Sequence, residues 1–149
     1  MSAFTVVKGN GISDVDGISA FDDALLNAGI GNYNLVSVSS IIPGKSMRTN
    51  NIPIFEPGTI LHCVIARKDI KYNEIGAVSL GYSISTKYGV VAEVAGTKQS
   101  ETHERCLQIL KEMTRSRCEE FETPIVETQE FICNNSRYAC SVIVLVLLE

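Results

Sequence analysis

The sequence predicts an α+β domain in which two helices pack against β-structure. The chain has 149 residues, the length of one domain. Two segments carry apolar residues at the spacing of an amphipathic helix, and six or seven carry the β-branched or alternating patterns of strands. Apolar residues make up 45% of the chain and charged residues 20%, so the composition excludes a disordered or fibrous protein.

An edge strand and a helix are expected at the start of the chain. Residues 4–7 form a short apolar run, and the Gly9-Asn10-Gly11 sequence after it is typical of a turn. Ser19, with Asp22 three residues later, approximates a capping box and predicts a helix with acidic residues in its first turn. Gly29 is expected to end this helix. Its apolar face would consist of Phe21, Ala24, Leu25 and Ala28.

The middle of the chain is rich in strand patterns. Residues 34–42 are largely β-branched and partly alternating, which predicts one strand that ends at Pro43-Gly44. Two prolines and an Asn-Asn pair predict a loop over residues 45–58. Three further strands are predicted over residues 59–66, 74–85 and 88–95.

The last third of the chain contains the clearest helical pattern. Residues 100–121 carry an apolar stripe on one face, and Pro124 prevents the helix from continuing. Residues 125–132 and 138–148 predict two strands joined by a turn. Because residues 142–148 have no polar face, the last strand is expected to be central and buried on both sides.

Charge and cysteine content limit the possible functions. The net charge of −4 argues against a basic nucleic-acid-binding surface. The five cysteines form no CxxC pair, which favours free thiols in a reducing compartment over disulfides or a zinc site. The first residues lack the apolar region of a signal peptide, and no segment has the roughly 20 apolar residues of a membrane span. A cytoplasmic protein is expected, with no metal and no membrane or nucleic-acid partner.

The common catalytic motifs are absent from the sequence. It contains no GxSxG, no Walker loop, no GxGxxG and no HExxH. His62 and Cys63 are neighbours in a predicted strand, so their side chains would point to opposite faces and could not share a metal. His62 is interpreted as a structural or interface residue, and His103, at the start of the second helix, as a solvent-exposed one.

Residues 21–44, FDDALLNAGIGNYNLVSVSSIIPG, are dense in small residues and asparagine and contain a Ser-Ser pair. This segment resembles the processing-site region of the pyruvoyl-dependent arginine decarboxylases, which share a run like FD-x-ALLNAGIGN-x-NL, then a short β segment, Ser-Ser, Ile and proline. Downstream, Ala92-Glu93-Val94 resembles the family's short Glu-containing strand, which a long helix follows. Gly44 departs from the pattern, since the family often has a second proline there. The match covers Phe21-Asp22, residues 24–32, Asn34-Leu35, Ser39-Ser40-Ile41 and Pro43.

The resemblance implies a four-layer α/β/β/α sandwich that assembles as a trimer or a dimer of trimers, with active sites between subunits. It implies one domain over residues 1–149, cut autocatalytically between Ser39 and Ser40 into a β chain (1–39) and an α chain (40–149). Ser40 would become a covalent pyruvoyl group, the cofactor, whose carbonyl forms a Schiff base with the substrate and accepts the electrons left when CO₂ departs. The implied reaction converts L-arginine to agmatine and CO₂, which makes the protein a carbon–carbon lyase.

The same resemblance assigns catalytic roles to Asn34 and Glu93. Glu93 would donate a proton to the substrate Cα, and its apolar neighbours would raise its pKa to suit a general acid. Asn34 would orient the scissile peptide or the bound substrate. From the residues alone, the alternatives are an exposed strand glutamate for Glu93, a turn residue for Asn34 and two hydrogen-bonded strand hydroxyls for Ser39 and Ser40.

Three further residues are implied to bind substrate. Asp22 would pair with the cationic end, since a carboxylate matches a guanidinium fork, and Leu25 and Ile41 would contact the rest of the molecule. The alternatives are helix stabilisation for Asp22 and core packing for Leu25. Residues 1–39 carry a net charge of −3 out of −4, an acidic field suited to a cationic substrate.

Two other functions stay open on the sequence. The substrate could be another amino acid, such as histidine or lysine, because Asp22 indicates a cation but not the length of its side chain. The chain could instead be an unprocessed, non-catalytic oligomeric relative that keeps the fold. Polyamine synthesis and acid resistance both stay open as the role of an arginine decarboxylase.

Overall fold

The computed structural model describes residues 2–148 and contains two helices and nine strands within that range. In chain order they are β1 (Ala3–Ser13), α1 (Gly17–Asn27), β2 (Asn34–Ser37), β3 (Ile41–Ile42), β4 (Met47–Arg48), β5 (Ile60–Lys71), β6 (Ile75–Ile84), β7 (Gly89–Gly96), α2 (Gln99–Arg115), β8 (Ile125–Ile132) and β9 (Tyr138–Leu148). No helix in this range combines the length and the apolarity required to cross a membrane.

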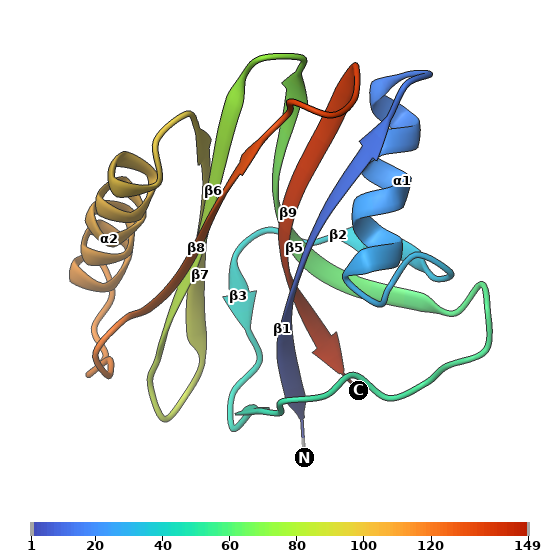
Figure 1. Ribbon diagram of the computed structural model, residues 1–149. Coiled ribbons are helices and arrows are strands. Elements are labelled where there is room, and N and C mark those ends of the chain that lie inside the picture. The colour runs from blue at the N-terminus through green and yellow to red at the C-terminus, as the bar shows by residue number, and fades with distance from the viewer. Residues whose placement is uncertain (1, 149) are drawn as a thin grey trace.

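The strands form two sheets that face each other (Figure 1). Sheet A has the order β2-β5-β9-β1-β4, and sheet B has the order β3-β7-β6-β8. α1 packs on the outer face of sheet A and α2 on the outer face of sheet B, so the layers run α1, sheet A, sheet B, α2. The α+β class and the four-layer α/β/β/α sandwich are thereby confirmed.

Three apolar clusters hold the layers together. One lies between the sheets, one between sheet A and α1, and one between sheet B and α2. β9 contributes to both faces of sheet A, as predicted for a central strand: Ile143 and Leu145 pack between the sheets, whereas Val144 and Val146 pack under α1. An all-apolar strand is stable there because both of its faces are covered.

The first strand differs from its prediction. β1 extends to Ser13, and Gly9-Asn10-Gly11 lies within it as a regular part of the antiparallel pairing with β9. The glycines allow α1 to approach closely: a Cβ on Gly9 would lie 2.1 Å from the Ala24 carbonyl oxygen, and one on Gly11 would lie 2.2 Å from the Ala24 nitrogen. The glycines therefore do not form a turn; they allow the backbone of α1 to pack closely against β1.

The start of the first helix also differs from its prediction. Asp16, not Ser19, is the N-cap, and its carboxylate accepts a hydrogen bond of 2.7 Å from the Ser19 backbone N–H. That bond lowers the pKa of Asp16. α1 has no acidic residue in its first turn, since Asp22 lies in the middle of the helix and Asp23 accepts a bond from the Ile12 N–H. The prediction that these acids lie in the first turn of the helix is wrong.

The second helix is shorter than predicted. α2 ends at Arg115, and residues 116–124 form an irregular link to β8. Phe121, predicted to continue the helical stripe, instead packs its ring edge-on against Tyr88, with ring centroids 5.8 Å apart. The apolar pattern persisted past the helix because this link packs against the same cluster as α2 does.

Candidate active site

The Ser39-Ser40 pair lies where the chain crosses from one sheet to the other. β2 pairs with β5 in sheet A up to Ser37, and β3 pairs with β7 in sheet B from Ile41. The prediction of one continuous strand over residues 34–42 is therefore wrong: residues 38–40 are a link between two strands in facing sheets. Pattern alone could not show this, since both halves carry β-branched residues and pairing partners are distant in sequence.

The polar groups of the link are only partly bonded. The Val38 N–H donates to the Cys63 carbonyl at 2.9 Å, and the Val91 N–H donates to the Ser40 carbonyl at 2.8 Å. Within residues 2–148, neither serine hydroxyl has a hydrogen-bond partner. Ser39 is exposed and Ser40 is half-buried. The alternative of two bonded strand hydroxyls is thus not what the structure shows, and both hydroxyls are free to rotate.

Glu93 lies close to this link on β7. Val91 packs between the sheets, whereas Val90 and Ala92 pack under α2, so the alternation of side chains turns Glu93 toward sheet A. Glu93 is two residues beyond Val91, which holds the Ser40 carbonyl, and lies on the same face of the strand. The structure therefore brings together the serine pair and the predicted proton donor.

The carboxyl of Glu93 is partly enclosed at the open edge of β7. β3 pairs only with Gly89 and Val90, so the described part of the chain places no strand beside Glu93 on that side. Glu93 is exposed in the single chain, yet enough protein surrounds its carboxyl that burial raises its pKa above the ordinary value. A raised pKa keeps a proton on the group at a higher pH, as a general acid requires.

Asn34 is held at the opposite end of β2. Its side-chain amide donates to the Gly58 carbonyl at 3.0 Å, and its backbone N–H donates to the Thr59 carbonyl at 2.9 Å. Five residues of extended chain span roughly 16 Å, so within one chain Asn34 does not lie beside Ser39. Its observed contacts fix the loop that precedes β5.

Asp22 and Leu25 lie on the outer layer of the molecule. Asp22 is exposed on α1, whereas Leu25 is buried in the cluster between α1 and sheet A. α1 covers the outer face of sheet A (Figure 1), whereas Glu93 lies on β7 of sheet B, on the side that faces sheet A. Within one chain, sheet A therefore lies between Asp22 and Glu93. Ile41, by contrast, directly follows Ser40 and pairs with Val90.

A groove lies on the outer face of sheet A, beside Phe21 of α1. It has a volume of about 400 Å³ and is lined by Phe21, Leu35, Ser37, Ile65 and Arg67. The Arg67 guanidinium stacks on the Phe21 ring at 3.8 Å and is held by the Asp69 carboxylate at 3.0 Å. The groove is thus lined by apolar side chains and by one arginine whose charge is paired with Asp69.

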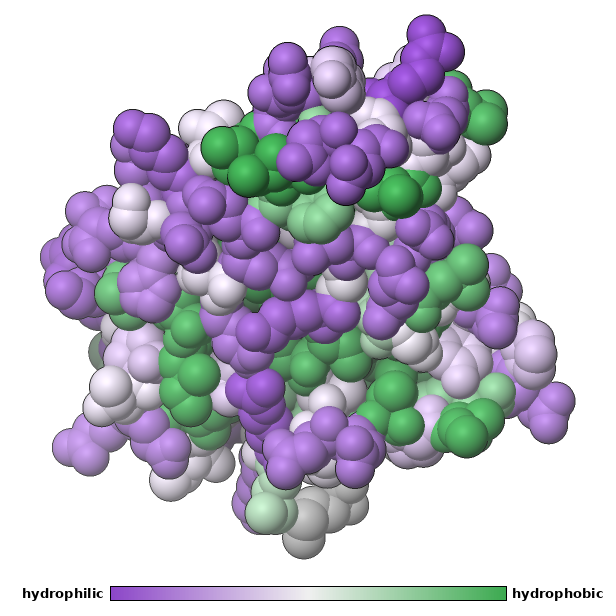
Figure 2. All heavy atoms as spheres, viewed as in Figure 1, coloured by the Kyte–Doolittle hydropathy of each residue, from purple (hydrophilic) through white to green (hydrophobic). Residues whose placement is uncertain are grey.

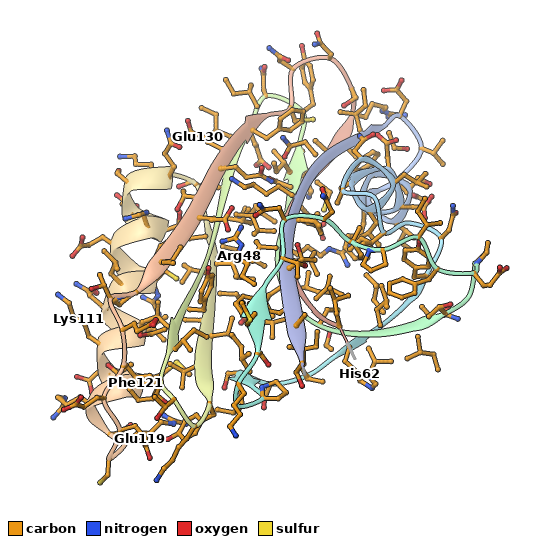
Figure 3. All side chains as sticks on the ribbon, turned by 90° about the horizontal axis from the view of Figure 1, so that it is seen from below. Arg48, His62, Lys111, Glu119, Phe121 and Glu130 are labelled. Carbon is orange, nitrogen blue, oxygen red and sulfur yellow. The ribbon has the colours of Figure 1, made fainter. Side chains whose placement is uncertain are left out.

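His62, Cys63 and His103 have the exposure that the sequence predicts. His62 is exposed and Cys63 is buried, as alternation requires, and His62 lies at the margin of the molecule (Figure 3). His103 is exposed on α2, and its Nδ1 lies 3.2 Å from the Thr128 hydroxyl. All five cysteines are free, and residues 2–148 contain no cluster of three or more His, Cys, Asp or Glu side chains suited to a metal.

One polar cluster at the other edge of the sandwich could not be predicted from the sequence. Glu127 on β8 pairs with Lys8 on β1 at 3.3 Å and with Arg48 on β4 at 2.7 Å, and Arg48 also donates to the Tyr82 hydroxyl at 3.0 Å. The available signal was Glu127 itself, a charged residue at an inward position of an alternating strand. Arg48 gave no signal because it is far from Glu127 in the sequence.

Together, these features define a class of protein. A small α/β/β/α sandwich with a serine pair at the crossing between its sheets, and a carboxyl of raised pKa beside it, is the arrangement expected of a pyruvoyl-dependent decarboxylase.

Comparison with known proteins identifies the family. The family model of pyruvoyl-dependent arginine decarboxylase matches residues 3–149. A protein of that name from Methanothermobacter thermautotrophicus is 29% identical over 130 residues, 85% of each chain. Another, from Methanopyrus kandleri, is 35% identical over 117 residues, 78% of this chain and 76% of that one. A third, from Pyrococcus horikoshii, is 35% identical over 102 residues, 64% of this chain and 63% of that one. The chain belongs to the pyruvoyl-dependent arginine decarboxylase family, which confirms the resemblance.

Proposed function

We propose that this chain is a precursor that cuts itself between Ser39 and Ser40 and then decarboxylates L-arginine to agmatine and CO₂. The observation that carries the proposal is the link that crosses between the two sheets. Within residues 2–148 its two serine hydroxyls have no hydrogen-bond partner, and the Val91 N–H on β7 holds the Ser40 carbonyl. Glu93 lies two residues beyond Val91 on that strand. Membership of the family supports it.

The cut would proceed through an ester. The Ser40 hydroxyl adds to the Ser39 carbonyl and displaces the Ser40 nitrogen, which gives an ester and a free amine. Loss of the Ser40 Cα proton then eliminates the Ser39 carboxylate, breaks the chain and leaves dehydroalanine at position 40. Tautomerisation to an imine and addition of water release ammonia and leave a pyruvoyl group. Because the Ser40 hydroxyl makes no hydrogen bond to any of residues 2–148, none of these bonds has to break before it reaches the preceding carbonyl.

The residues around the link suit such a group. A pyruvoyl carbonyl supplies the electron sink that a decarboxylation needs and that no ordinary side chain provides. The Val91 N–H holds the backbone of residue 40, and Ile41 presents an apolar surface next to it. Burial favours the protonated form of Glu93 at the same edge of the sandwich, and from there the proton would be delivered to the substrate Cα after CO₂ has left.

Substrate recognition would come from a second copy of the chain. Asp22 is on the outer layer and cannot meet Glu93 within one chain. It lies on α1 between Ile18 and Leu26, which are 76% and 48% exposed, so an apolar ridge surrounds a carboxylate. Figure 2 shows other apolar residues reaching the surface among hydrophilic ones. We infer a cytoplasmic homo-oligomer, a trimer or a dimer of trimers, in which α1 of one chain covers the link of the next, with Asp22 on the guanidinium and Leu25 behind it.

The test is the mass of the purified chain. Cleavage predicts fragments of 39 and 110 residues, the larger starting with a pyruvoyl group. Ser40→Ala should abolish both cleavage and CO₂ release, whereas Ser37→Ala, at the end of β2 where it lines the outer groove, should leave both intact. One full-length species after long incubation would support the non-catalytic alternative.

The substrate is tested with a panel of amino acids. CO₂ release from arginine should exceed release from lysine and histidine, because a guanidinium fork matches the Asp22 carboxylate and an ammonium or imidazolium does not. Equal or higher release from lysine or histidine would overturn arginine as the substrate while leaving the cleavage mechanism in place.

A further inference from the structure

Cleavage would change how the segment after Ser40 is held. Residues 40–48, here called the arm, run from β3 in sheet B across the end of the sandwich to β4 in sheet A (Figure 1). In the precursor, the arm is tied covalently through Ser39 to β2. After a cut at the serine pair, residue 40 would become a free chain end, and only non-covalent contacts would fix its position.

The contacts close to residue 40 are few. β3 has two residues in register with β7, Ile41 with Val90 and Ile42 with Gly89, and the Ser40 carbonyl adds one bond to Val91. Ile42 is buried between the sheets. A pairing of two residues is short for a strand, so the arm needs a second point of attachment to stay in register.

That second point is Arg48, at the far end of the arm. β4 pairs with the start of β1, which places Arg48 in register with Phe4 and turns its side chain into the space between the sheets. Figure 3 shows Arg48 between the ribbons of the two sheets. Its guanidinium donates to the Tyr82 hydroxyl at 3.0 Å and lies 2.7 Å from the Glu127 carboxylate. The Tyr82 ring in turn packs edge-on against the Phe4 ring, with ring centroids 5.1 Å apart.

The Glu127 carboxylate favours the docked position of Arg48. Its side chain is 18% exposed, and within residues 2–148 its buried Oε2 has no aligned hydrogen-bond donor, so the Arg48 charge compensates it. Lys8 contacts the other carboxylate oxygen, Oε1, at 3.3 Å, but Lys8 belongs to β1 and not to the arm. Withdrawing Arg48 would leave a buried carboxylate oxygen without its nearest cation, which opposes movement of the arm.

We propose that Arg48, held by Glu127 and Tyr82, is a positioning residue that keeps the arm docked after self-cleavage, so that residue 40 stays beside Glu93. The inference rests on the proposed cleavage at Ser39-Ser40. Arg48 does not reach the reacting atoms and acts only through the arm. Its importance follows from the cut: the precursor keeps the covalent link to β2, and the cleaved protein does not.

The experiment compares Arg48→Met with Lys8→Met in cleaved protein and in uncleaved Ser40→Ala protein. Both substitutions remove a cation from Glu127, but only the first lies on the arm. Hydrogen–deuterium exchange of peptides covering residues 41–48 should rise at least about tenfold in cleaved Arg48→Met and stay near wild type in the other three combinations. The kcat for decarboxylation should fall about tenfold or more with KM within about twofold, and Arg48→Lys should restore part of it.

The outcomes separate this inference from the cleavage proposal. Intact mass is measured first, and a single uncleaved species would overturn the proposed function and this inference with it. With cleavage confirmed, equal exchange of the arm in all variants would overturn the role of Arg48 alone. Equal loosening in cleaved and uncleaved Arg48→Met, or an equal effect of Lys8→Met, would make the cluster merely structural and would also refute the proposal.

Discussion

The carboxyl of Glu93 lies in a strand otherwise made of valine, alanine and glycine. Burial raises its pKa, which means that the folded chain favours the protonated form more than the unfolded chain does. The linked effect on stability has a definite sign. As the pH rises above 4.5, the ordinary pKa of a glutamate, the carboxyl loses its proton in the unfolded chain before it does so in the folded chain. The free energy of unfolding therefore falls until the pH has passed the raised pKa of Glu93 in the folded state. The feature that suits Glu93 to proton donation thus makes the fold less stable at neutral pH.

Glu93→Gln separates these two effects. The kcat should fall by about 10²–10⁴, since the amide cannot donate a proton to the substrate Cα. The melting temperature should rise relative to wild type at pH 7, because no charge has to be desolvated, and the difference should vanish near pH 4. Steady-state kinetics and thermal unfolding at the two pH values measure both. Glu104→Gln, on the exposed face of α2, is the control and should change neither. A normal kcat would remove Glu93 from the mechanism.

At the scale of elements, α1 packs closely on β1 at Gly9. Gly9→Ala should destabilise the chain by about 1–3 kcal/mol or more, because the new Cβ would lie 2.1 Å from the Ala24 carbonyl and the helix would have to shift. Gly17→Ala is the matched control, since a Cβ there meets nothing within 4 Å. Urea unfolding of the two variants measures the difference. Equal stability would show that α1 does not rest on the strand at Gly9.

The same contact explains what the sequence could and could not predict about the fold. Helical spacing located both helices, and the all-apolar run of residues 142–148 located the central strand, because burial leaves a periodic pattern. Gly9-Asn10-Gly11 has the pattern of a turn but lies within β1, because glycine is used both in turns and where two backbones pack closely. Its packing partner is Ala24, on the helix that follows. The split of residues 34–42 between two sheets depends on β5 and β7, which local pattern does not include.

The candidate site shows the same division. Ser39, Ser40 and Glu93 could be chosen from the sequence through their resemblance to a family, and the fold places them together. Arg48 could not, because its ion pair with Glu127 joins residues 79 positions apart in the sequence, and a single arginine in a polar loop has no pattern. Long-range polar contacts of this kind become visible only with the pairing of the sheets.

At the scale of the whole molecule, the proposed cut divides the chain but not the domain. Residues 1–39 supply β1, α1 and β2, and β1 pairs with β9 over eleven residues in the interior of sheet A. Removing this fragment would open the apolar cluster between the sheets and the one between sheet A and α1. The two chains are therefore expected to stay associated after cleavage and to separate only on unfolding.

The position of Asp22 on the outer layer leads to a prediction about assembly. If each active site takes Glu93 from one chain and Asp22 from its neighbour, Asp22→Ala and Glu93→Gln should each be nearly inactive alone but should complement each other. Random mixing of equal amounts during co-expression would make about a quarter of the sites intact, since each site draws one residue from each of two chains. CO₂ release from the co-expressed mixture should approach that fraction of wild type. Activity no higher than that of the two variants assayed separately would place Asp22 and Glu93 in the same chain's site and would refute the shared interface.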